Sequence, residues 1–94
     1  MSVGQHLTAV EVSVTSSAGG TTVLAENALR TFLAIHNIED QAMSFTTDGT
    51  TPTTSTGFSL PAGSVWTFDH EPPQGAVKAI SHSGTKKVRI AEGV

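Results

Sequence analysis

Residues 29–36 read Leu-Arg-Thr-Phe-Leu-Ala-Ile-His, and this stretch decides whether the fold contains a helix. Apolar residues from Leu24 to Ile35 recur at near-helical spacing, and several good helix formers lie among them. The same eight residues also alternate between two faces that each carry apolar side chains, as in a strand buried on both sides. We therefore predict a strand over 29–36, with Asn37 opening a turn, and a helix across 24–36 remains the alternative.

Shorter alternating stretches lie on both sides of this segment. Val10, Val12 and Val14 share one face of a predicted strand over residues 7–14. Further strands are predicted over 42–46, 58–60, 64–69, 76–81 and 87–91. The alternation predicts which side chains are buried, namely Phe32 or Leu33, Ile35, Phe45, Val77 and Ile80.

Turn-forming residues separate the predicted strands. Pro61 and Gly63 suit the second and fourth positions of a type I turn, and residues 82–85 suit a hairpin loop between the last two strands. Residues 47–57 contain Asp-Gly and Pro signals and nothing that could anchor a core, so we expect an exposed loop there.

These features predict an all-β fold, a small β-sandwich or jelly-roll-like barrel of seven to eight short antiparallel strands. We divide the chain into an N-terminal strand or arm with a Gly-rich tether, residues 1–21, and a β-sandwich core, residues 22–94. The Val-rich strand suits an arm that adds to a neighbouring sheet, and in that case residues 22–94 fold without it. An ordinary first strand of the chain's own sheet is the alternative.

The composition restricts the possible functions. Ser and Thr supply 24 of the 94 residues, only 14% of residues are charged, and the formal net charge is −3. A nucleic-acid-binding field is therefore not expected. The chain has no cysteine, which excludes disulfides and thiolate chemistry. Its start lacks the features of a signal peptide, and no apolar run approaches the ~20 residues of a spanning helix, so no membrane partner is expected.

No catalytic, cofactor-binding or metal-binding residue is predicted. The serines lie in turn-like segments without a G-x-S-x-G motif. The loop over 48–57 lacks the Gly-Lys pair of a phosphate loop and the carboxylates of a calcium loop. The triplet Asp69-His70-Glu71 suits a solvated connection better than a metal site. The other histidines show no metal-binding spacing; they are His6, His36 and His82.

Two groups of residues are candidates for contact with a partner. Four basic residues fall in the predicted C-terminal hairpin and could meet an acidic partner, although a solvated face is the plainer interpretation; they are Lys78, Lys86, Lys87 and Arg89. Trp66 and Phe68 share one face of a predicted strand and are most simply core residues. The alternative is that they anchor an interface.

The order of the strands and turns carries a resemblance. Residues 30–37 read Arg-Thr-Phe-Leu-Ala-Ile-His-Asn, and residues 58–68 read Phe-Ser-Leu-Pro-Ala-Gly-Ser-Val-Trp-Thr-Phe. Met-Ser-Phe at 43–45, a Gly-led strand at 75–81 and the ending Val-Arg-Ile-Ala-Glu-Gly at 88–93 complete the pattern. Over residues 22–93 the chain resembles small all-β accessory proteins of tailed bacteriophage virions.

The resemblance lies in scaffold positions, so it assigns no site residues. It implies a non-enzymatic virion structural protein, a capsid decoration or cement protein that bridges neighbouring subunits of the shell. The implied partners are the phage major capsid protein or other virion subunits, together with further copies of the chain in a homo-oligomer. The implied location is the virion, assembled in the host cytoplasm. A tail- or fibre-associated module that recognises a host surface ligand is the alternative.

Overall fold

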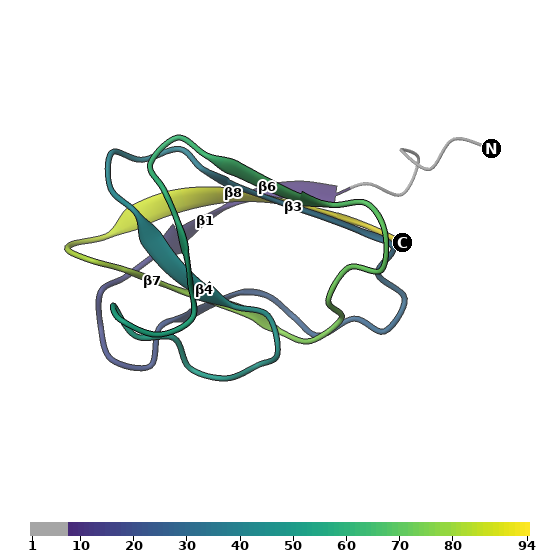
Figure 1. Cartoon of the computed structure of the whole chain (residues 1–94), viewed down its shortest axis with the longest axis horizontal. Helices are drawn as coiled ribbons and strands as arrows, with labels where there is room; N and C mark the ends of the chain where they lie inside the picture. The colour runs from purple at the N-terminus through teal and green to yellow at the C-terminus, as the bar shows by residue number, and fades with distance from the viewer. Residues whose placement is uncertain (1–7) are drawn as a thin grey trace.

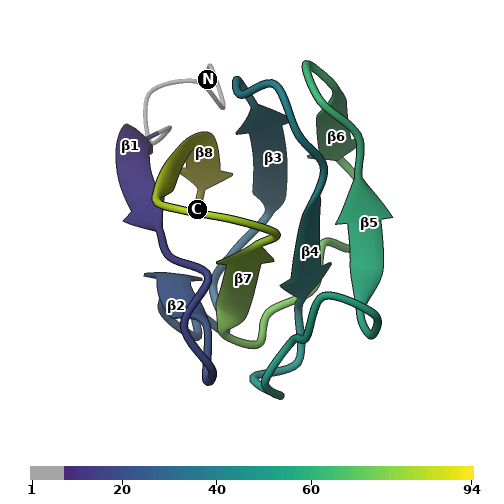
Figure 2. The same cartoon turned by 90° about the vertical axis from the view of Figure 1, so that its left-hand side faces the viewer.

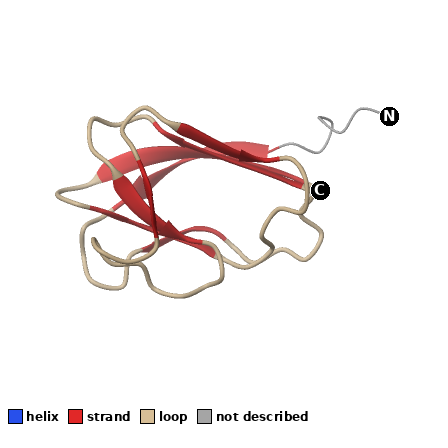
Figure 3. Cartoon of the chain, in the orientation of Figure 1, coloured by secondary structure: helices blue, strands red, loops and turns tan. Residues whose placement is uncertain are grey.

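The computed structural model describes residues 8–94, and this part of the chain forms eight strands and no helix (Figure 3). The strands are β1 (Thr8–Val14), β2 (Thr21–Leu24), β3 (Phe32–Asn37), β4 (Met43–Thr46), β5 (Phe58–Leu60), β6 (Val65–Phe68), β7 (Val77–Ser81) and β8 (Lys86–Gly93). The predicted all-β fold is confirmed. Leu7, where the first strand was expected to begin, and His6 lie outside the described residues.

Two antiparallel sheets of four strands pack face to face as a sandwich (Figures 1 and 2). The first sheet has the order β1-β8-β3-β6, and the second has the order β2-β7-β4-β5. The first strand therefore pairs with the last, the second with the seventh, the third with the sixth and the fourth with the fifth. Because these pairs alternate between the two sheets, the chain winds around the sandwich in the strand order of a jelly roll.

The deciding stretch is a strand, and the helix alternative is wrong. β3 begins at Phe32 rather than at Leu29, because residues 27–30 form a turn in which the Arg30 N–H donates to the Asn27 carbonyl (3.2 Å). Residues 21–24, which no predicted strand covered, form β2 at the edge of the second sheet. This strand escaped prediction because four residues show too little alternation to stand out.

The predicted core positions are confirmed. Leu33, Ile35, Phe45 and Val77 are fully buried between the sheets, and Phe32 is half-buried on the outer face. Ile80 is also buried, but it does not belong to the core cluster. Alternation along β7 places it on the opposite face from Val77.

The hairpin expected at 82–85 is not present, because β7 and β8 do not pair. Among consecutive strands of the described residues, only β4 and β5 are neighbours in a sheet. β7 and β8 belong to different sheets, and the segment between them crosses the sandwich. The segment between β5 and β6 crosses in the same way. Its turn lies one residue later than predicted: the Ser64 N–H donates to the Pro61 carbonyl, and Gly63 occupies the third position with φ of +74°. Positive φ at that position is the property of a type II turn.

The N-terminal strand is built into the first sheet of its own chain. All seven residues of β1 are in register with β8, from Thr8 opposite Glu92 to Val14 opposite Lys86. Val14 is fully buried in the core. Within a single chain, β1 is thus an ordinary first strand of the chain's own sheet rather than an arm that adds to a neighbouring sheet.

Candidate functional site: the uncharged edge of the sandwich

The two outer strands on one side of the sandwich carry no charged residue. Strands β5 and β6, joined by residues 61–64, are the outer strands of their respective sheets and lie on the same side of the molecule (Figure 2). Together they form what we call the β5–β6 edge, residues 58–68. Between Asp48 and Asp69 the sequence contains no charged residue and no histidine. Charges commonly protect exposed edge strands from pairing with other chains, and this edge lacks them.

Aromatic rings run outward from the core to this edge. The Phe45 ring, which is fully buried, stacks on Phe58 with centroids 5.6 Å apart. Phe58 meets the Trp66 ring edge-on at 3.7 Å, and Trp66 lies 4.6 Å from Phe68. The four rings thus connect the second sheet to the first.

Trp66 lies at the rim of the core rather than within it. It is in register with Ile35, so its side chain faces the space between the sheets, as the sequence suggested. Yet it remains 36% exposed, because β6 is the outermost strand of its sheet and no further strand covers it. The prediction that Trp66 is a core residue is therefore wrong in its degree of burial, whereas Phe68 is half-buried and packs against the core.

A mostly apolar hollow of about 310 Å³ opens between the two outer strands. Its apolar walls are Phe58, Leu60, Pro61, Val65 and Trp66. Val65, which points outward from the first sheet, is 56% exposed. The edge therefore combines an open strand, an exposed Val and a hollow that an apolar side chain of another molecule could fill.

A buried amide holds the turn of this edge in place. Asn37 is fully buried at the end of β3, and its Nδ2 donates to the carbonyls of Leu60 (3.0 Å) and Gln41 (2.8 Å). Its backbone N–H donates to the Ser64 carbonyl (2.9 Å). The sequence indicated only that Asn37 opens a turn, because the residues that it joins are far apart along the chain.

The Thr-rich loop beside the edge is exposed, as expected, apart from one buried residue. Pro52 is fully buried and lies against Gly20, which anchors the loop outside the hydrophobic core cluster. Both the hydroxyl of Thr50 (2.6 Å) and its backbone N–H (3.1 Å) donate to Asp48 Oδ1. These hydrogen bonds, the hydroxyl first, lower the pKa of the Asp48 carboxyl below its ordinary value. A second hollow of about 340 Å³ lies between this loop and Phe58.

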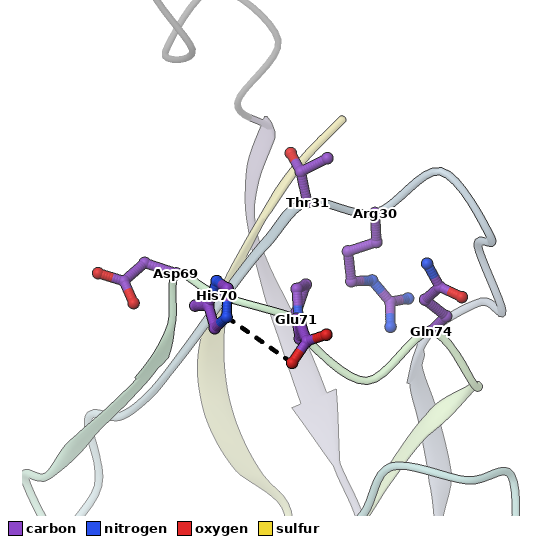
Figure 4. A pocket seen from close by; sticks show the side chains of 7 residues that line it. Arg30, Thr31, Asp69, His70, Glu71 and Gln74 are labelled. Atoms are coloured by element: carbon purple, nitrogen blue, oxygen red, sulfur yellow. Dashed lines mark ion pairs between the residues drawn. The ribbon is translucent and has the colours of Figure 1, made fainter.

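Another hollow, of about 550 Å³, is lined by Arg30 and by the polar residues 69–71 (Figure 4). Arg30 is 1% exposed, and its guanidinium donates to Glu92 (Nε, 2.8 Å) and to the carbonyls of Ala25, Pro73 and Gly75. It therefore joins three separate segments at one end of the sandwich. The sequence did not single out this role, because Arg30 lies in an ordinary polar position of the expected strand.

The polar triplet at the rim of that hollow is solvated. His70 and Glu71 approach to 3.7 Å with nearly fully exposed side chains, and Asp69 points away from Glu71 (Figure 4). In the described part of the chain, no group of three metal-ligating side chains comes together. Ser44 Oγ lies 3.5 Å from His82 Nε2, but Ser44 is buried and not placed to meet a substrate.

The basic residues do not form one patch. Lys78 lies on β7, and the other three lie on β8 in the opposite sheet. Lys86 pairs with Asp40 (3.4 Å), and Glu11 on β1 forms ion pairs with both Lys87 (3.5 Å) and Arg89 (3.4 Å). Nearby carboxylates thus offset the charge of β8.

Comparisons with known proteins returned no relative: no family model matches the chain, and searches of curated proteins and of solved structures found no match. Residues 8–94 include no helix that is long and apolar enough to cross a membrane.

Proposed function

We propose that this chain is a non-enzymatic structural protein of a phage virion, which decorates or cements the capsid shell by bridging neighbouring subunits. The β5–β6 edge is the observation that carries this proposal. It combines an uncharged stretch of sequence, an open outer strand and exposed Val65 and Trp66. Such a surface suits contact with protein better than permanent contact with water.

Two further features support a role in assembly. Jelly rolls occur in viral capsid and lectin domains, although a fold by itself does not assign a function. The sequence resemblance to phage accessory proteins narrows that choice toward the virion. The buried polar side chains have structural contacts instead. Arg30 donates to backbone carbonyls of separate segments, and Ser44 is buried.

The proposal is tested on particles with and without the protein. Quantitative mass spectrometry should find a copy number comparable with that of the major capsid protein. Particles stripped of the protein should fall apart at lower temperature or lower salt, and adding the protein back should restore them. Stripped particles that survive equally well would contradict the cement role, and a few copies per particle would place the protein in the tail.

A second candidate is a tail- or fibre-associated module that recognises a host surface ligand. The observation that favours it is the position of Phe58, which lines both the apolar hollow and the hydroxyl-rich hollow beside Asp48. Rings next to hydroxyls and a carboxylate suit a polar ligand with an apolar face, such as a sugar. Titration of soluble host glycans against Trp66 fluorescence tests it, and no change at millimolar glycan would count against it.

A further inference from the structure

We infer that two copies of this chain associate by antiparallel pairing of their β6 strands, which would join their first sheets into one continuous sheet. The inference rests on the proposed function only in treating the β5–β6 edge as a protein-contact surface. It goes beyond that function by naming the partner, a second copy, and the strand that it pairs with.

The backbone of β6 offers the contact. β6 pairs with β3 along one side, from Val65 opposite His36 to Phe68 opposite Leu33. Along its other side, no strand of the described residues pairs with it. That side presents a row of N–H and C=O groups that another strand can satisfy.

The other outer strands carry features that discourage pairing. β1 carries Glu11, which is held between Lys87 and Arg89. β2 changes register between Thr22 and Leu24, and β5 is only three residues long. Charges, irregularities and short length are the usual protections of an edge. β6 carries no charge and pairs regularly, so it is the outer strand most open to a partner.

Charge selects the direction of pairing. Asp69 follows β6 directly, so parallel pairing would place the Asp69 carboxylates of two copies side by side. Antiparallel pairing places them at opposite ends, so that neither carboxylate faces another charge. It also creates a closed two-fold contact, the commonest symmetry among soluble oligomers.

Side-chain alternation selects the register. Residues opposite one another in a sheet share a face, so a two-fold pairing must centre on Trp66 or on Thr67. The first register places Trp66 opposite Trp66 of the second copy, and the other places it opposite Phe68 of that copy. Both cover the exposed indole with an aromatic ring. A specific interface buries more than ~1,000 Å² in total, which is more than four paired residues provide. We expect the hollow between β5 and β6 to supply the additional apolar contact.

The single tryptophan makes the test direct. Sedimentation velocity of the whole chain should show a concentration-dependent change from one copy to two. Because Trp66 is the only Trp, its emission should shift to shorter wavelength and its quenching by acrylamide should fall as the dimer forms. Thr67→Glu adds a charge to an exposed position of β6 and should raise the dimer dissociation constant at least tenfold. Thr22→Glu makes the same change on the exposed face of β2 and should leave dimerisation unchanged.

Each outcome decides the inference. Val65→Lys serves as a second edge variant if Thr67→Glu does not fold by circular dichroism. A chain that stays monomeric at all concentrations overturns self-pairing, as does a dimer that Thr22→Glu abolishes and Thr67→Glu leaves intact. If a monomeric chain binds stripped particles and Thr67→Glu prevents this, the edge pairs with a virion subunit instead. The inference then fails while the proposed function stands.

Discussion

At the scale of single residues, buried polar side chains hold in place the connecting segments that have no strand partner. Asn37 and Arg30 are both fully buried, and both donate mainly to backbone carbonyls of distant segments. No buried side-chain nitrogen or oxygen among the described residues lacks a hydrogen-bond partner. Such groups stabilise a particular loop arrangement, because losing one partner leaves the others desolvated and unsatisfied.

Replacing Arg30 should be strongly destabilising. Arg30→Gln removes the guanidinium from three backbone carbonyls and from the Glu92 carboxylate, which keeps only its hydrogen bond from Asn27 Nδ2. Loss of one partner of a buried pair costs about 3–5 kcal/mol. The free energy of unfolding in urea measures this loss. Arg89→Gln is the matched control, since Arg89 is exposed and its pair with Glu11 is worth about 0–1 kcal/mol. Equal losses in both variants would contradict the structural role of Arg30.

The titration of Asp48 should report the order of the Thr-rich loop. Its pKa is lowered in the folded chain, chiefly by the Thr50 hydroxyl. The carboxylate therefore favours the folded state above its ordinary pKa, and this contribution disappears as pH falls through the lowered folded pKa. Thr50→Val should raise the Asp48 pKa toward its ordinary value, as measured by NMR. An unchanged pKa would mean that the loop does not hold this hydrogen bond.

At the scale of elements, strands that alternate clearly were predicted correctly, whereas the pairing of the two strands that flank residues 82–85 was not. Leu33 and Ile35 are buried because a strand places every second residue on one face. The connection 82–85 resembled a hairpin but crosses between sheets. Local turn signals reveal where a chain bends and do not reveal which strand it pairs with next.

The entry into β5 depends on a glycine. Gly57 has φ of +89°, and a Cβ there would lie 2.6 Å from the Phe45 carbonyl oxygen. Gly57→Ala should therefore suffer both backbone strain, of roughly 1–3 kcal/mol, and a steric clash. Gly49→Ala shares the positive φ but meets no atom within 4 Å, so it isolates the strain. In the Gly57→Ala variant, the midpoint temperature of thermal unfolding should be well below that of Gly49→Ala. Equal midpoints would show that the close approach is absent.

At the scale of the whole molecule, the first sheet of the sandwich joins the two ends of the described chain. β1 and β8 lie side by side in the first sheet, so neither end of the fold is complete until the other has formed. This pairing also makes β1 part of the core through Val14. The sheets leave two open sides, and only the side formed by β5 and β6 lacks charge along its whole sequence.

Removing the first strand should weaken the whole domain. A chain of residues 22–94 loses Val14 from the core and exposes the edge of β8 along seven residues. We expect lower thermal stability and a greater tendency to aggregate than in the full chain, measured by circular dichroism and light scattering. A truncated chain as stable as the full one would instead support an exchangeable N-terminal arm.

The sequence by itself determined the all-β class, most strand positions and the buried positions of Leu33, Ile35, Phe45 and Val77, because these follow from local alternation. Tertiary structure alone decided the rest. Trp66 lies at the rim because β6 is outermost, and Arg30 and Pro52 are buried because distant segments converge on them. The open edge also arises only once the strands are ordered into sheets. Pairing between strands far apart in the chain depends on the packing of both complete sheets. It therefore cannot be predicted from any short stretch of residues.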